Sequence, residues 1–134
     1  MKHSNPTTMN ALLRRLNRAC DFQRWLNDEG ESLIASADLL GGKPWATRAK
    51  VIVATAREGG DLAARRTTLV ALHRLLEGRS VGLLEGPEAW RFSLLHPDDP
   101  RATRAMLCAE ALGRGMRALE ALRLLGISTV GGVE

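Results

Sequence analysis

The chain has 134 residues and a mass of 14.6 kDa, a length that favours one domain spanning residues 1–134. Hydrophobic residues make up 45% of the chain and charged residues 25%, which excludes collagen-like, low-complexity and disordered classes. The net charge of +4 and the isoelectric point of about 9.8 permit contact with phosphate or acidic partners without establishing nucleic-acid binding.

Residue usage predicts an all-α fold. Leucine occurs 22 times and alanine 18 times, whereas valine occurs six times, isoleucine three times and tyrosine not at all. Leucine and alanine favour helices, and strands need the β-branched and aromatic residues that are scarce here. We therefore predict a single-domain bundle of five or six helices, with long first and last helices and a buried central helix.

In the first part of the chain, apolar periodicity predicts helices over residues 8–28, 31–40 and 45–58. Gly30 is expected to end the first of them, and Pro44 is expected to open the third. Residues 1–7 are expected to form a loose tail. The residues of the first helix that are expected to face the core are Met9, Leu12, Leu13, Leu16, Ala19, Cys20 and Leu26.

In the second part, the same periodicity predicts a helix over 62–77, a short helix over 88–95 and a long helix over 101–125. The helix over 62–77 is apolar almost all round in its second half, so it is the predicted central helix. Residues 127–134 are expected to form a tail. The residues of the last helix that are expected to face inward are Ala105, Cys108, Ala109, Leu112, Gly115, Met116, Leu119 and Leu122.

The leading functional prediction is a non-enzymatic protein–protein interaction module, such as a small bacterial regulator or adaptor. Phe22 and Trp25 point away from the main apolar face of the first helix and lie beside Arg18. Exposed aromatic residues next to arginine are enriched in binding hot spots. These three residues are the predicted partner site, and Trp25→Ala is expected to weaken binding while leaving the melting curve almost unchanged. The partner is expected to be another protein or a second copy, through the first or last helix.

The first alternative is nucleic-acid binding by a helix-turn-helix-like segment. Residues 43–66 contain six basic residues against two acidic ones, with a glycine turn between two predicted helices. The residues that would contact nucleic acid are Lys43, Lys50, Arg57, Arg65 and Arg66.

The second alternative is a small enzyme or metal-binding protein around His73 and His96. Arg66 and His73 share one stripe of the helix over 62–77, where they are candidates for a polar pocket. The aspartates after His96 are explained by turn formation and helix capping. The histidines and cysteines lack zinc spacing, so no metal, cofactor or catalytic residue is predicted.

The chain begins without the apolar stretch of a signal peptide, and no stretch reaches the roughly 18 apolar residues that a membrane span requires. Cys20 and Cys108 are 88 positions apart and do not resemble a disulfide framework. We therefore expect a cytoplasmic protein without membrane association.

Overall fold

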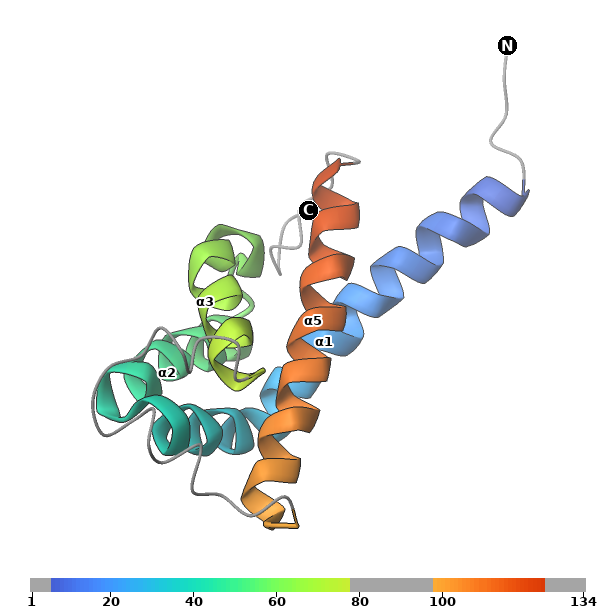
Figure 1. The fold of residues 1–134 in the computed structure, drawn as a ribbon. Helices are drawn as coiled ribbons and strands as arrows, with labels where there is room; N and C mark the ends of the chain where they lie inside the picture. The colour runs from blue at the N-terminus through green and yellow to red at the C-terminus, as the bar shows by residue number, and fades with distance from the viewer. Residues whose placement is uncertain (1–5, 78–97, 125–134) are drawn as a thin grey trace.

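The computed structural model describes residues 6–77 and 98–124. Within these residues the chain forms helices and no strand (Figure 1), which confirms the all-α class. The elements are α1 (Pro6–Gly41), α2 (Lys43–Arg57), the 3₁₀ helix η1 (Leu62–Arg65), α3 (Arg66–Leu76) and α5 (Pro100–Leu124). The described residues hold four α-helices, so the predicted five or six is wrong for this part of the chain. The predicted helix over 88–95 and the predicted tail over 127–134 lie outside the described residues.

The two helices predicted on either side of Gly30 follow one another within α1 and meet at a kink. The helix bends at Glu29, whose φ of −113° and ψ of 18° are not helical. Gly30 is buried, and a Cβ atom there would lie 2.6 Å from Cγ1 of Val53 in α2. The close approach of α2 therefore requires glycine here, and the break predicted at Gly30 falls within one residue of the kink between the two halves of α1. The predicted loose tail is also too long, because α1 begins at Pro6.

α2 turns back along the second half of α1. Gly42 precedes α2 with a φ of 77°, a conformation that favours glycine, and Pro44 lies in the first turn as predicted. The far end of α2 reaches the middle of α1, where the Gln23 side chain donates a hydrogen bond to the Ala56 carbonyl at 3.1 Å. The two helices therefore form an antiparallel hairpin.

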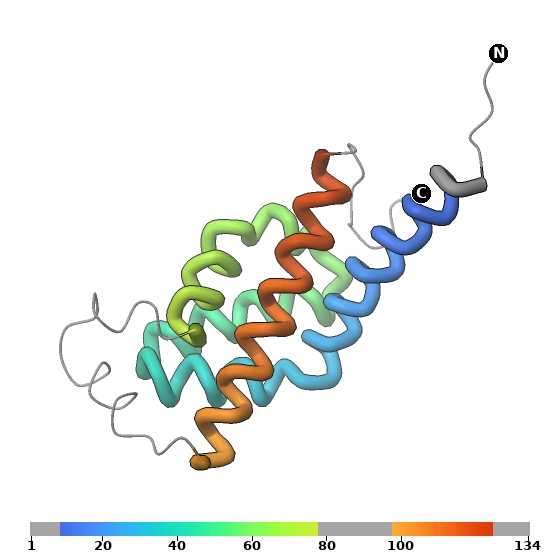
Figure 2. Tube along the Cα trace, turned by 45° about the vertical axis from the view of Figure 1, so that its right-hand side comes forward, coloured from blue at the N-terminus to red at the C-terminus, as the bar shows by residue number. Residues whose placement is uncertain are grey.

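The first half of α1 extends beyond α2, as both views show (Figures 1 and 2). α2 ends at Arg57, which donates a hydrogen bond to the carbonyl of Asn27 at 3.4 Å. α2 therefore does not cover the apolar stripe nearer the N-terminus. Met9 is 45% exposed and Leu13 49%, and Cys20 is exposed. The prediction that these three residues face the core is wrong for this reason.

α5 lies between α1 and α3 (Figure 2), and glycines allow both neighbours to approach it. A Cβ atom at Gly115 would overlap the ring of Phe22 in α1. A Cβ atom at Gly113 would lie 3.1 Å from Nε2 of His73 in α3. The predicted inward arc of α5 is confirmed for seven of its eight residues, and Met116 is half-buried. Burial extends further round the helix, to Ala111, Gly113 and Ala118.

The prediction that the helix over 62–77 is the buried centre is wrong. This segment begins as η1, where Asp61 accepts a hydrogen bond from the backbone N–H of Ala63 at 3.0 Å. It continues as α3, which keeps an exposed side that carries Arg66, Thr67 and Arg74. Leucines fill the opposite side and enter the common core. The largest fully buried side chains are Leu26, Leu33, Leu40, Ile52, Val53, Leu69, Leu72, Leu75, Leu76, Leu112 and Leu122.

The two cysteines differ in exposure, which predicts a large difference in their reactivity. Cys108 is buried and burial raises its pKa, although the Ser36 hydroxyl donates a weak hydrogen bond to its sulfur. A thiol with a raised pKa holds less of the reactive thiolate at a given pH. At pH 8 we expect an aromatic disulfide reagent to modify Cys20 rapidly and Cys108 only after denaturation. Equal rates for both thiols in the folded protein would contradict this packing.

Candidate functional site

α1 and α5 enclose a groove of about 680 Å³, here called the α1–α5 groove. Its α1 side chains recur at helical spacing, so they share one side of that helix. Small residues of α5 form much of the opposite wall and keep the groove open. The lining residues are Arg15, Arg18, Asp21, Phe22 and Trp25 of α1, and Ala111, Arg114, Gly115, Arg117, Ala118 and Ala121 of α5.

The floor of the α1–α5 groove is aromatic. The rings of Phe22 and Trp25 are stacked, with centroids 6.4 Å apart and an interplanar angle of 13°. Phe22 is only 4% exposed because Gly115 of α5 lies against its ring. Trp25 is half-buried and packs against the core while it lines the groove. The groove therefore offers an apolar surface whose position is set by the α1–α5 crossing.

Four arginines surround this floor, two from each helix. Arg15 and Arg18 extend from α1, and Arg114 and Arg117 extend from α5. All four are exposed, and none forms a hydrogen bond or ion pair with another residue in the described part of the chain. Each guanidinium therefore presents its donors to solvent or to a ligand.

Asp21 is the acidic residue among those that line the α1–α5 groove, and it does not neutralise these arginines. Oδ1 of Asp21 lies 3.6 Å from Nη1 of Arg24, and both side chains are about 70% exposed (69% and 71%). An ion pair with this exposure is weak, but it directs Asp21 towards Arg24. The groove is consequently positively charged and suits an anionic ligand.

The structure brings Arg18, Phe22 and Trp25 together in the α1–α5 groove. The expectation that Phe22 is exposed is wrong, because α5 crosses α1 at this point and Gly115 covers the ring. Trp25 is not free of the core either. Trp25→Ala should therefore lower the melting temperature, contrary to the sequence-based expectation.

Sequence reasoning missed three arginines of the groove. Arg15 was not distinguished from the other basic residues of α1, although it precedes Arg18 by one helical turn. Arg114 and Arg117 have the same spacing on α5. Glu110 precedes Arg114 by four residues, a spacing that favours an ion pair on a helix, but no ion pair forms between these two described residues. The sequence does show one pair of arginines on each of two long helices. That the two pairs line the same groove follows only from the crossing of α1 and α5 in the structure.

The predicted nucleic-acid residues are spread over α2, η1 and α3, and two of them, Lys50 and Arg57, line a common pocket. Arg57 pairs with Glu31, with Nη1 and Oε2 3.6 Å apart, and Arg66 pairs with Glu120. Lys43 and Arg57 lie at opposite ends of α2, about 20 Å apart along the helix axis. The remaining two predicted residues are Lys50 and Arg65, which are exposed.

Arg66 and His73 line different pockets, so they do not form the predicted shared polar pocket. His73 lies against Gly113, and its Nδ1 is 3.5 Å from Oε1 of Glu77. His96, the other residue proposed for metal or catalysis, lies outside the described residues. Within the described ranges, no group of three or more His, Cys, Asp and Glu residues is arranged to hold a metal ion.

One of the two aspartates near the start of α5, Asp99, caps the helix. Oδ1 of Asp99 accepts a hydrogen bond from the backbone N–H of Arg101 at 2.8 Å, as expected for a helix cap. The Arg101 side chain also bonds to this carboxylate. The capping role predicted for one of these aspartates is confirmed for Asp99.

Among the helices of residues 6–77 and 98–124, none combines the length and the apolar character needed to cross a membrane. Comparisons with known proteins add no family. No protein-family model matches the chain, and searches of curated proteins and of solved structures found no significant match. The functional proposal therefore rests on the residues of this chain.

Proposed function

We propose that this protein is a non-enzymatic interaction module that binds an acidic, amphipathic segment of another protein in the α1–α5 groove. The observation that carries the proposal is the set of four arginines without acidic partners around an apolar floor. An acidic segment would satisfy the guanidinium donors, and its apolar residues would cover Trp25. Charge complementarity of this kind increases the rate and the specificity of association.

The spacing of the arginines favours a helical segment as the ligand. Arg15 and Arg18 are separated by about 4.5 Å along α1, and so are Arg114 and Arg117 along α5. Carboxylates three or four residues apart on a ligand helix repeat at a similar distance. Guanidinium groups also bind carboxylates in a bidentate manner.

Nucleic acid is the second candidate, because phosphate also binds arginine. Nucleic-acid grooves usually follow the backbone with charges and offer stacking surfaces for successive bases. Here the arginines concentrate around one groove, and Phe22 is covered by α5. The remaining aromatic surface of the groove is that of Trp25, which supports a protein segment more than a run of bases.

Fluorescence anisotropy with four labelled probes tests the proposal. The first is an acidic amphipathic peptide of about five helical turns, with leucines on one side and glutamates on the other. The second has the same composition in scrambled order, the third replaces each glutamate with lysine, and the fourth is a single-stranded DNA of similar length. We expect the acidic amphipathic peptide to bind at least tenfold more tightly than each of the others, and its affinity to fall as salt rises.

Other outcomes would overturn the proposal. Equal binding of the scrambled peptide would show a simple charge effect without a docking groove. Tighter binding of DNA would favour the nucleic-acid alternative. The lack of measurable binding by the acidic peptide would remove the α1–α5 groove as an acidic-segment site.

A further inference from the structure

A second pocket, of about 200 Å³, lies between α3 and α5. Its walls are apolar: Leu69 and Val70 come from α3, and Met116 and Leu119 come from α5. Leu69 and Leu119 belong to the buried core, so these walls are held in place by packing. The volume is below the roughly 300–1,000 Å³ of sites for drug-sized ligands, which limits an occupant to a small molecule.

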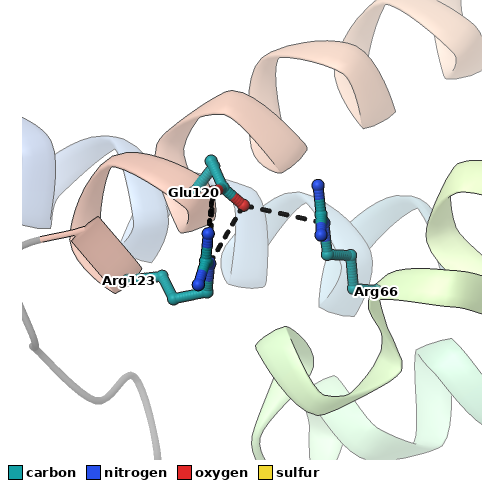
Figure 3. Close-up of polar contacts among 3 residues, drawn as sticks. All are labelled: Arg66, Glu120 and Arg123. Atoms are coloured by element: carbon teal, nitrogen blue, oxygen red, sulfur yellow. Dashed lines mark hydrogen bonds and ion pairs between the residues drawn. The ribbon is translucent and has the colours of Figure 1, made fainter.

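Charged side chains meet beside this apolar pocket. Arg66 of α3 and Arg123 of α5 both approach the carboxylate of Glu120 (Figure 3). Nε of Arg123 donates to the two carboxylate oxygens at 3.2 Å and 3.1 Å. These hydrogen bonds lower the pKa of Glu120, so its carboxylate stays ionised at neutral pH. Arg117 also lines the pocket, so the local balance is three cations against one anion.

Arg66 forms an ion pair with Glu120, but its guanidinium keeps free hydrogen-bond donors. Its Nε atom lies 3.6 Å from Oε1 of Glu120, which is an ion-pair distance beyond hydrogen-bond range. Its side chain is 67% exposed. The guanidinium forms no hydrogen bond with any residue in the described part of the chain. A carboxylate beside the pocket would therefore find a bidentate donor pair available.

We propose that this pocket binds a small organic acid, with the carboxylate on Arg66 and a short branched or aromatic tail against Leu69, Val70 and Met116. A cationic ligand would face Arg66 and Arg123 at close range. A neutral ligand would leave the donors of Arg66 unused. The combination of a guanidinium with an apolar pocket selects an acid that carries a hydrocarbon tail. Arg117 lines both this pocket and the α1–α5 groove, but Arg66 lines this pocket and not that groove, so variants at Arg66 test this proposal separately.

Methyl-detected NMR titrations of the full chain provide the test. The probes are 4-methylpentanoate, its neutral amide and acetate. We expect 4-methylpentanoate to shift the methyl signals of Leu69, Val70 and Leu119, with a dissociation constant of about 0.1–1 mM for a ligand of this size. The amide and acetate should each bind at least tenfold more weakly.

Two matched variants isolate the guanidinium. Arg66→Met removes its charge and keeps most of the stem, whereas Arg65→Met makes the same change at an exposed neighbour that does not line the pocket. We expect Arg66→Met to weaken binding of 4-methylpentanoate at least tenfold and Arg65→Met to leave its dissociation constant unchanged. The proposal would be overturned if the two variants had equal effects, or if acetate or the amide bound as tightly as 4-methylpentanoate. It would also be overturned if the shifts were confined to other methyl groups, or if no shifts appeared at a ligand concentration 20-fold above the expected dissociation constant.

Discussion

Replacing Phe22 with alanine is expected to lower the free energy of unfolding by about 3–5 kcal/mol. The ring is 4% exposed, is stacked on Trp25 and is enclosed by Gly115 of α5. Its removal leaves a cavity where α1 and α5 cross, and the backbones cannot close that cavity without moving the helices. Urea denaturation followed by circular dichroism measures the change. A loss below about 1 kcal/mol would show that Phe22 is not a core residue.

A double-mutant cycle with Gly115 tests the same crossing more specifically. Alanine normally improves a helix by about 1 kcal/mol over glycine, but a Cβ atom at Gly115 would overlap the ring of Phe22. We expect Gly115→Ala to be destabilising alone and less so in the Phe22→Ala background. Gly113→Ala is the matched control two positions away, because its nearest neighbour is the ring edge of His73 at 3.1 Å. Additive effects would contradict a direct contact between Phe22 and Gly115.

Reversing the charge of Arg15 and Arg18 is expected to weaken binding of the acidic amphipathic peptide about 30-fold. Exposed ion pairs contribute up to about 1 kcal/mol each, so two reversed charges change binding by about 2 kcal/mol. Both side chains are exposed and form no ion pair within the described residues. Folding should therefore be little affected. Anisotropy titrations of the double variant Arg15→Glu, Arg18→Glu at low salt measure the effect.

The double variant Lys43→Glu, Lys50→Glu is the control for net charge. It changes the charge of the chain by the same amount, on exposed residues of α2 that do not line the α1–α5 groove. We expect it to reduce binding of the acidic peptide less than threefold. It also removes two residues of the nucleic-acid alternative, so a larger loss of DNA binding here than in the Arg15 and Arg18 variant would favour that alternative.

Local features of the fold were predictable from the sequence because they depend on neighbouring residues. Pro44 marks the start of α2, Asp61 caps η1 and Asp99 caps α5. The break near Gly30 was predictable because glycine ends many helices, but its contact with Val53 was not, because that contact depends on a helix that comes later in the chain. Periodicity identifies an apolar stripe but does not show where its covering helix ends.

The candidate site was only partly predictable for a similar reason. Arg18 and Trp25 were found because they are close on one helix, and both line the α1–α5 groove. Arg114 and Arg117 join them through the crossing of two helices that are far apart in sequence. The Phe22 ring was predicted to be exposed because a helical wheel cannot show that Gly115 approaches it. Small residues at a crossing become informative only when their neighbours are known.

The affinity ratio between the glutamate peptide and the lysine peptide tests the proposed groove most directly. It should be measured for the unmodified protein, for the variant at Arg15 and Arg18, and for the control at Lys43 and Lys50. Binding in the α1–α5 groove predicts that this ratio falls at least tenfold in the arginine variant and changes little in the lysine control. An equal fall in both variants, or no fall in the arginine variant, would show that acidic segments do not bind between α1 and α5.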